Sequence, residues 1–202
     1  LEIKKETSKT VVKFKETKRI YSFKCQLTAN FEIENLICAI LIAKLNGLSF
    51  TKIFNSVKNI KPPKGRLNII KTSYKDISVY IDYAHTPEAL KYSLLAMKII
   101  SEGKGRIFLL FGCGGNRDKG KRKLMAKIAE KNADKVFITD DNPRNEDANA
   151  IRIEISSNCK NSINISGRKR AIHKAINSME KGDYLLIAGK GHEKHQEIKN
   201  KI

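Results

Sequence analysis

Four short segments of the sequence combine glycine with acidic, basic or amide side chains, and each follows an apolar run. They are residues 82–87 (Asp-Tyr-Ala-His-Thr-Pro), 112–122 (Gly-Cys-Gly-Gly-Asn-Arg-Asp-Lys-Gly-Lys-Arg), 140–144 (Asp-Asp-Asn-Pro-Arg) and 189–193 (Gly-Lys-Gly-His-Glu). Guanidinium groups bind carboxylates and phosphates through paired hydrogen bonds, and carboxylates bind ammonium groups. Together the four segments predict a site for a small charged molecule.

The segment at residues 140–144 has the side chains best suited to bind such a molecule. Asp141, Asn142 and Arg144 place an acid, an amide and a guanidinium within four residues, and Pro143 restricts the backbone between them. This combination can bind both the ammonium and the carboxylate of one ligand. The alternative is a solvated turn, and residue chemistry alone does not favour either interpretation.

The glycine-rich segment resembles a phosphate-binding loop but departs from it at one position. Residues 115–121 fit the pattern G-x-x-x-x-G-K, yet the next residue is Arg122, where such a loop requires Ser or Thr to bind magnesium. We therefore interpret the segment as a glycine-rich turn. Its function is either structural or to direct Arg117 toward an anion.

The histidines and the first acidic position allow weaker inferences. Asp82 and His85 lie between an apolar run and a helix start, so they could contact a ligand, or Asp82 could cross-link its own loop. His192 and His195 are three residues apart, but no acid or third histidine is spaced to complete a metal shell. We predict no metal site in this chain.

The elements that must position these segments alternate between strand and helix. The predicted strands are residues 77–81, 106–111, 135–139 and 184–188. Helix signals follow them, such as Thr86 as a cap and Pro87 at the first helical position. This alternation predicts an α/β fold with a Rossmann-like open, mostly parallel sheet and helices on both faces. In such sheets ligands bind beyond the carboxyl ends of the strands, where the four polar segments lie.

The first sixty residues follow a different pattern. Apolar runs at residues 10–14 and 20–27 predict a hairpin or sheet edge. A helix capped by Asn30 is predicted to end near Gly47, and a second helix is predicted over residues 51–58.

The sequence Lys-Pro-Pro-Lys-Gly at residues 61–65 interrupts all periodicity. We therefore predict two domains, residues 1–64 and residues 65–202.

Net charge and cysteine content exclude some classes of protein. The formal net charge is +19, but 31 of the 40 basic residues are lysines that are spread over the whole chain. We interpret them as a solvated surface rather than a nucleic-acid interface, although they would attract acidic small substrates. The four cysteines form no C-x-x-C pair, which fits a reducing cytoplasm. No apolar run approaches the about 18 residues of a membrane-spanning helix.

In order and spacing, the four polar segments resemble the motifs of the UDP-N-acetylmuramoyl-tripeptide synthetases, the MurE type of Mur ligase. The resemblance covers residues 28–202. Phe31 and Asn35 resemble the start of a helix that contacts the nucleotide in this family, and Gly65-Arg66 resembles its interdomain Gly-Arg pair. Glu32 departs from the pattern, because many members have an amide there, and Ala29 stands where many have glycine.

The resemblance implies a position for this chain within a three-domain enzyme. Residues 1–64 would form the end of the central ATP-binding domain, after an expected stretch that contains the phosphate-binding loop, the carbamylated lysine and the magnesium ligands. Residues 65–202 would form most of the carboxy-terminal, amino-acid-binding domain and stop short of its usual end. The catalytic residues are therefore expected before Leu1, which has the character of a cut start.

The resemblance also assigns binding residues, without a general base among them. The residues implied to bind the amino acid are Arg117, Asp141, Asn142, Arg144, Gly189 and Glu193. Those implied to face ATP are Asn35, Arg66, Asp82 and His85.

The implied reaction is ATP- and Mg²⁺-dependent ligation in peptidoglycan precursor synthesis. ATP would phosphorylate a carboxylate of UDP-N-acetylmuramoyl-L-alanyl-D-glutamate, and the amine of meso-diaminopimelate would attack the acyl phosphate. A cytoplasmic monomer that binds neither nucleic acid nor membrane is expected, and this chain alone is expected to be inactive.

Three alternatives remain at the level of sequence. One is a ligase of the same family that adds L-lysine; members that do so generally lack an arginine at the position of Arg144. Because lysine has no distal carboxylate, it would leave this guanidinium unpaired at a cost of roughly 2 to 5 kcal/mol. The others are a basic nucleic-acid-binding module and a non-catalytic α/β binding domain.

Overall fold

The computed structural model describes residues 2–6, 9–16, 19–27, 29–61, 63–70, 72–193 and 195–199. The chain divides into two compact units, Leu1–Pro63 and Lys64–Ile202, which are considered separately below.

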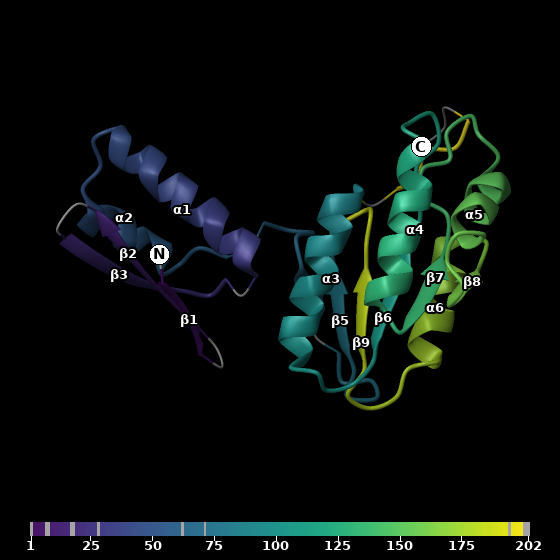
Figure 1. The fold of residues 1–202 in the computed structure, drawn as a ribbon, viewed down its shortest axis with the longest axis horizontal. Coiled ribbons are helices and arrows are strands. Elements are labelled where there is room, and N and C mark those ends of the chain that lie inside the picture. Colours follow the sequence, from purple (N-terminus) through teal and green to yellow (C-terminus); the bar gives the residue numbers. More distant parts are fainter. Residues whose placement is uncertain are drawn as a thin grey trace. The chain divides into compact units, whose positions relative to one another are not determined.

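Unit 1 is a small antiparallel sheet with two helices (Figure 1). Its elements are β1 (Glu2–Glu6), β2 (Lys9–Glu16), β3 (Arg19–Cys25), α1 (Asn30–Leu45) and α2 (Phe50–Val57). The predicted hairpin is present as β2 and β3, which pair in register from Thr10 opposite Cys25 to Glu16 opposite Arg19. Strand β1 was not predicted from the sequence.

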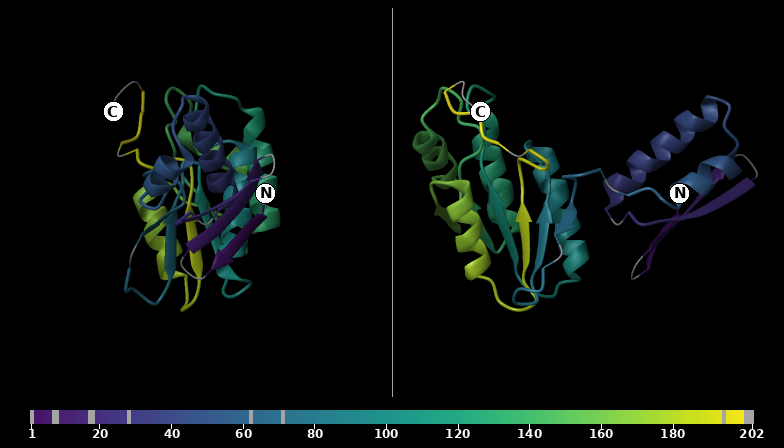
Figure 2. Two further views of the ribbon diagram at one scale, coloured as in Figure 1. Left: turned by 90° about the vertical axis from the view of Figure 1, so that its left-hand side faces the viewer. Right: turned by 180° about the vertical axis from the view of Figure 1, so that it is seen from behind.

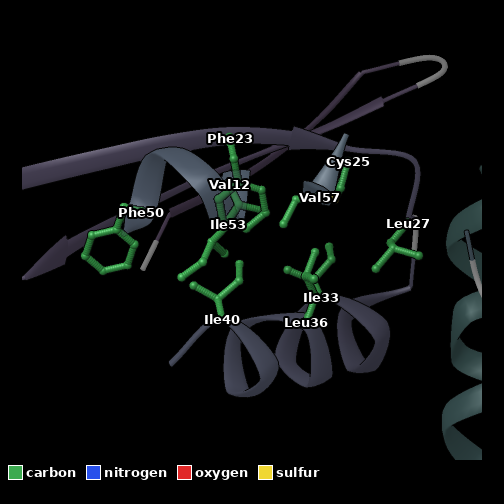
Figure 3. Packing of buried hydrophobic residues seen from close by; sticks show 10 residues of the cluster. All are labelled: Val12, Phe23, Cys25, Leu27, Ile33, Leu36, Ile40, Phe50, Ile53 and Val57. Carbon is green, nitrogen blue, oxygen red and sulfur yellow. The ribbon is translucent and has the colours of Figure 1, made fainter. Parts of the chain in front are cut away.

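The core of unit 1 lies between its sheet and its helices (Figure 3). Ile33 and Ile40 of α1 are buried there with Val12 of β2. Aromatic rings complete this core, since the rings of Tyr21 and Phe50 lie 4.2 Å apart between centroids. Aromatic contacts of this kind contribute free energy beyond the area that they bury.

The predicted cap of α1 is wrong by one residue. Asn30 is the first helical residue, and Ala29 is the N-cap. The carboxylate of Glu32 accepts a hydrogen bond of 3.1 Å from the backbone N–H of Ala29. An acidic residue at the third helical position satisfies a free N–H and interacts favourably with the helix dipole, so this helix start does not need Asn30 as a cap.

Unit 2 contains a six-stranded sheet in the order β4-β5-β9-β6-β7-β8. Its strands are β4 (Asn68–Ile70), β5 (Ser78–Ile81), β6 (Ile107–Phe111), β7 (Lys135–Ile138), β8 (Ser162–Asn164) and β9 (Tyr184–Ile187). Among the described strands of this sheet, the β4–β5 pair alone is antiparallel. The predicted open, mostly parallel sheet is confirmed, whereas the three-residue strands β4 and β8 were not predicted.

Helices cover both faces of this sheet, as predicted (Figures 1 and 2). They are α3 (Pro87–Ser101), α4 (Gly120–Asn132), α5 (Ala148–Ser156) and α6 (Arg168–Asn177). Helix α4 contacts both α3 and α5, while α6 packs on β6, β7 and β9. The predicted start of α3 is confirmed, because Thr86 Oγ1 accepts a hydrogen bond from the N–H of Ala89 and Pro87 is the first helical residue.

Every residue of the central strand β6 is buried, as expected for a parallel strand covered on both faces. Phe108 and Leu110 pack in one cluster with Ala171 and Ala175 of α6. The alternate residues of β6 point to the opposite face because side chains alternate along a strand. Among the described residues, no helix has the length and apolar character needed to cross a bilayer.

Candidate functional site

A pocket of about 540 Å³ lies where β5, β6, β7 and β9 of unit 2 end. All six residues that the sequence assigned to amino-acid binding line it, as does His85. The six are Arg117, Asp141, Asn142, Arg144, Gly189 and Glu193. Parallel strands have their carboxyl ends at one edge of the sheet, which brings together loops that are far apart in the sequence.

Two glycines allow these loops to approach closely. The N–H of Gly115 donates a 2.9 Å hydrogen bond to the carbonyl of Asn142, and a Cβ on Gly115 would lie 2.0 Å from the Pro143 carbonyl oxygen. Gly189 has φ +105°, and a Cβ there would lie 3.0 Å from Asp141 Oδ2. Any other residue at position 115 would displace the backbone, and at position 189 it would be strained by the positive φ.

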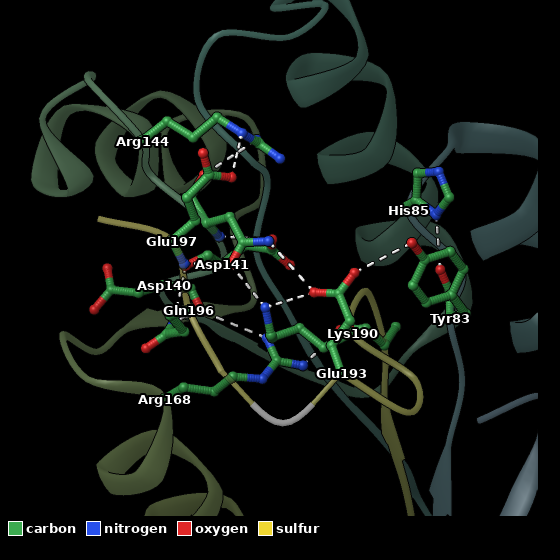
Figure 4. Close-up of polar contacts among 12 residues, drawn as sticks. Tyr83, His85, Asp140, Asp141, Arg144, Arg168, Lys190, Glu193, Gln196 and Glu197 are labelled. Carbon is green, nitrogen blue, oxygen red and sulfur yellow. Dashed lines mark hydrogen bonds and ion pairs between the residues drawn. The ribbon is translucent and has the colours of Figure 1, made fainter. Parts of the chain in front are cut away.

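A network of charged and amide groups connects two of the loops (Figure 4). Lys190 Nζ donates to Asn142 Oδ1 and to Glu193 Oε2, both at 2.8 Å. Sequence reasoning did not select Lys190, although it lies within the recognised segment at residues 189–193. Because Lys190 is only 6% exposed, its ammonium depends on these partners, and it fixes the amide and the carboxylate that face the pocket.

The environment of Glu193 keeps it ionised. Burial alone would raise the pKa of this carboxyl, but hydrogen bonds from Lys190, Tyr83 and Asn142 lower it below its ordinary value. The Tyr83 hydroxyl donates to Glu193 Oε1 at 3.2 Å. Burial and this contact with the carboxylate raise the pKa of Tyr83. At neutral pH Glu193 therefore presents a carboxylate to the pocket, with Lys190 as its existing cationic partner.

Arg144 already has a carboxylate partner within the chain. Its Nε lies 2.8 Å from Glu197 Oε2, and its Nη1 donates to the carbonyl of Gly115 at 2.9 Å. The premise that lysine would leave Arg144 unpaired is therefore wrong. A ligand carboxylate would add to an existing ion pair, so the expected selectivity is smaller than roughly 2 to 5 kcal/mol.

The glycine-rich segment has the geometry of a turn, with its two arginines in different environments. Arg117 is exposed and lines the pocket. Arg122, in contrast, has a side chain that is only 2% exposed and forms ion pairs with Glu146 at 2.9 Å and Glu154 at 2.7 Å. Arg122, which departs from the phosphate-loop pattern, thus connects α4 to α5 and to the loop before α5.

Asp82 cross-links its loop to the segment before β4 and to α3, which agrees with one of the two interpretations of its position. Its side chain is buried, and its oxygens accept hydrogen bonds from the N–H groups of Leu67 and Ala84, both at 2.7 Å, and from Ser93 Oγ at 3.1 Å. A contact between Asp82 and a nucleotide stays a prediction.

The other residues assigned to the nucleotide are exposed. The guanidinium of Arg66 lies 4.7 Å from the centre of the Tyr83 ring, and His85 Nδ1 lies 2.9 Å from the Tyr83 carbonyl oxygen. Asn35 is exposed on α1, in unit 1. The described residues contain no cluster of three or more His, Cys, Asp or Glu side chains that could bind a metal ion.

Unit 2 is an α/β domain with a mostly parallel open sheet, and a pocket of mixed charge lies at its carboxyl edge, where such sheets generally bind ligands. Residues 65–191 match the family model described as Mur ligase, glutamate ligase domain. The chain belongs to the Mur ligase family.

Curated relatives include diaminopimelate-adding members of this family. The chain is 45% identical over 180 residues to UDP-N-acetylmuramoyl-L-alanyl-D-glutamate--2,6-diaminopimelate ligase of Rickettsia bellii, covering 88% of this chain and 37% of the relative. It is 38% identical over 179 residues to the ligase of the same name from Mesorhizobium japonicum, covering 89% and 37%. The chain thus spans well under half the length of these relatives.

Solved structures show the same similarity. A diaminopimelate ligase of this name is 30% identical with a TM-score of 0.65, over 98% of this chain and 41% of that one. UDP-N-acetylmuramate-alanine ligase from Thermotoga maritima is 20% identical with a TM-score of 0.69, over 90% and 40%, which supports the fold alone.

Proposed function

We propose that unit 2 binds the incoming amino acid in an ATP-dependent ligase of peptidoglycan precursor synthesis. The ligase would add meso-diaminopimelate to UDP-N-acetylmuramoyl-L-alanyl-D-glutamate, as the names of its relatives state for them. The main support is that six residues after three different strands line one pocket. A nucleic-acid-binding module does not require this convergence.

The charges of the pocket complement those of meso-diaminopimelate. This amino acid carries two carboxylates and two amino groups, so it requires cationic and anionic partners at separate places. Arg117 and Arg144 provide guanidinium groups, while Asp141 and Glu193 provide carboxylates. The lowered pKa of Glu193 favours binding of the ammonium group that does not react. The other amino group must be neutral to act as a nucleophile.

The proposed reaction proceeds in two steps. A carboxylate oxygen of the glutamyl substrate attacks the γ-phosphorus of ATP, which forms an acyl phosphate and releases ADP. The neutral amine nitrogen then attacks the acyl carbon, the bond from this carbon to the phosphate oxygen breaks, and the nitrogen loses a proton. Unit 2 contributes by holding the amine in line, a source of catalysis that depends on orientation. No residue is assigned as the general base.

On the nucleotide side, the proposal uses fewer residues than the sequence suggested. Arg66 and His85 are exposed and free to contact ATP, whereas the oxygens of Asp82 already accept hydrogen bonds. We propose that unit 1, with Asn35, is the end of the ATP-binding domain. Because the described residues include no metal-binding cluster, magnesium ligands would come from further sequence of the ligase. A cytoplasmic, monomeric enzyme is part of the proposal, since the reaction consumes ATP.

A comparison of two amino acids tests this function. The assay uses the whole ligase, meaning this chain with the further sequence that its relatives possess, and measures kcat/KM with meso-diaminopimelate and with L-lysine. We expect meso-diaminopimelate to be strongly preferred. Arg144→Ala should lower kcat/KM for it by roughly 10- to 150-fold, the equivalent of about 1.5 to 3 kcal/mol for hydrogen bonds to a charged group.

Arg170→Ala is the matched control, because Arg170 is an exposed arginine of α6 that does not line the pocket. It should leave both values unchanged. Equal use of the two amino acids by the unmodified ligase would support the lysine-adding alternative and reject the assignment.

A further inference from the structure

A short segment after the pocket residue Glu193 runs beside the turn that contains Arg144. Within residues 195–199, the carbonyl of Glu197 accepts a 3.1 Å hydrogen bond from the N–H of Arg144, and the N–H of Lys199 donates to the Arg144 carbonyl at 2.9 Å. The Gln196 side chain donates to the Asp141 carbonyl at 2.7 Å. The segment is therefore attached to the turn at several points, and nothing in the sequence pattern had indicated this.

Glu197 contacts two pocket residues at once. Its N–H donates to Asn142 Oδ1 at 3.0 Å, and its carboxylate lies 2.8 Å from Arg144 Nε (Figure 4). The Arg144 side chain is 19% exposed, and the Glu197 side chain is 35% exposed. This ion pair thus lies at the wall of the pocket rather than on an open surface, where it would contribute little.

The contacts of Arg144 involve two of the three guanidinium nitrogens. Nε pairs with Glu197, and Nη1 donates to the carbonyls of Gly115 at 2.9 Å and of Asn142 at 3.5 Å. Within the described part of the chain, Nη2 makes no hydrogen bond, so its two N–H groups stay available. Arg144 also has φ +50°, a left-handed conformation that a non-glycine residue adopts only when its surroundings stabilise it.

We propose that Glu197 is a positioning residue that sets selectivity for an amino acid with a distal carboxylate. This inference rests on the proposed function of the pocket. A free arginine side chain loses much rotamer freedom when it binds a ligand. Glu197 holds Nε in the absence of the ligand, so the side chain of Arg144 has already lost this freedom when the ligand binds. The N–H groups of Nη2 are then oriented to donate to the ligand carboxylate.

The inference predicts an effect that depends on the ligand. Lysine lacks the distal carboxylate and gains nothing from an oriented Arg144, so loss of Glu197 should weaken binding of meso-diaminopimelate alone. A residue that merely stabilised the fold would affect both amino acids equally. Glutamine at this position retains an oxygen that can accept a hydrogen bond from Nε, so it should preserve most of the orientation.

The test uses the ¹⁵N-labelled 202-residue chain and titration with meso-diaminopimelate or L-lysine, followed by NMR chemical shifts. We expect Glu197→Ala to raise the Kd for meso-diaminopimelate about tenfold, which matches the loss of one hydrogen bond to a charged group. The Kd for lysine should not change. Glu197→Gln should stay within about threefold of the unmodified chain. The Nε proton of Arg144, followed by its NMR signal, should exchange with solvent faster in the alanine variant than in the unmodified chain.

Glu180→Gln is the matched control. Glu180 is another glutamate that pairs with an arginine, Arg106, but it lies at the other end of β9 and does not line the pocket. It should leave both dissociation constants unchanged.

Four results would overturn the inference. Three concern binding: an unchanged Kd for meso-diaminopimelate in Glu197→Ala, an equal loss for lysine, and tighter binding of meso-diaminopimelate, which would make Glu197 a competitor of the ligand. The fourth is an Arg144 Nε–H that remains protected from exchange in Glu197→Ala. If the unmodified chain binds no meso-diaminopimelate, the assignment of the pocket fails instead.

Discussion

The two units each contain a pocket of similar size, but only one of the two pockets has the groups that a charged ligand needs. The pocket of unit 1 has a volume of about 500 Å³ and is lined by Phe23, Cys25 and Phe54; Lys24 and Lys58 are the charged residues among its described lining. The pocket of unit 2, at about 540 Å³, contains both acids and arginines. A hollow of a given volume therefore does not define a site, whereas fixed groups of opposite charge do.

Topology explains the difference. In the antiparallel sheet of unit 1, β2 and β3 are joined by a short connection, and consecutive strands end at opposite edges. In unit 2 the parallel strands β5, β6, β7 and β9 end at one edge, and each is followed by a loop; the loops after β5, β6 and β7 lead to a helix. Polar residues from distant parts of the sequence meet only in the second arrangement.

The largest expected loss of stability comes from Arg122→Ala, which tests whether unit 2 can be destabilised without affecting unit 1. Arg122→Ala removes a guanidinium that is 2% exposed and breaks its ion pairs with Glu146 and Glu154. Breaking such a pair costs about 3 to 4 kcal/mol. Amide hydrogen exchange should accelerate in β6 and β7 while β2 and β3 are unchanged. Arg170→Ala, at an exposed position, is the control, and equal acceleration in both units would contradict their independence.

The reverse experiment targets unit 1. Ile33 is fully buried in α1, so Ile33→Ala should cost about 3 kcal/mol through lost burial and the cavity left behind. Faster exchange should be confined to β2, β3 and α1. Ile42→Ala, at a residue of the same helix that is 61% exposed, should change little. Spread of the effect into β6 would show that the two units unfold as one.

Asp183 is expected to make a pH-dependent contribution to the free energy of unfolding of unit 2. Burial by itself would raise the pKa of Asp183, but hydrogen bonds from Arg106 and from backbone N–H groups lower it below its ordinary value. A lowered folded-state pKa means that the stabilisation is present above the unfolded-state value, near 3.8, and is lost as the pH falls through the folded-state pKa. Acid should therefore destabilise unit 2 below about pH 4.

Asp183→Asn should lower the free energy of unfolding by about 2 kcal/mol at neutral pH. It should also reduce the dependence of that free energy on pH in the acid range. Asp76→Asn is the control, because Asp76 pairs with Lys181 at an exposed position. Urea titrations from pH 3 to 7, monitored by exchange in β9, measure both variants. An unchanged acid slope in Asp183→Asn would exclude this carboxyl as the cause.

The smallest expected change in stability comes from a substitution at Glu102, the residue after α3. Glu102 has φ +50°, a left-handed conformation that glycine adopts more easily. Glu102→Gly should therefore stabilise unit 2 by about 0.5 to 1 kcal/mol, despite loss of an exposed contact with Lys104. Glu102→Ala separates the contribution of the backbone from that of the contact with Lys104, since alanine loses the contact but does not adopt positive φ as easily as glycine. Destabilisation by the glycine variant, measured in urea, would contradict this explanation.

Most of unit 2 could be predicted because its signals are local. The apolar run of β6 and the Thr-Pro start of α3 each occupy consecutive positions, so they are visible without knowledge of any partner. The short strands β4 and β8 could not be predicted, because three residues show no periodicity and pair only with a neighbour that the fold provides. The N-cap at Ala29 was missed because the capping group is the side chain of Glu32.

The sequence by itself determined the alternation of strands and helices and the chemical character of the strand ends, since both depend on residue type and spacing. The family motifs also predicted that Arg117, Asp141 and Glu193 would share a site. Only the tertiary structure decided the partners of these groups: Asp82 accepts a hydrogen bond from Leu67, Lys190 bridges Asn142 and Glu193, and Arg144 pairs with Glu197. Ion pairs and hydrogen bonds form between atoms within a few ångströms, and a sequence does not state which distant residues come that close.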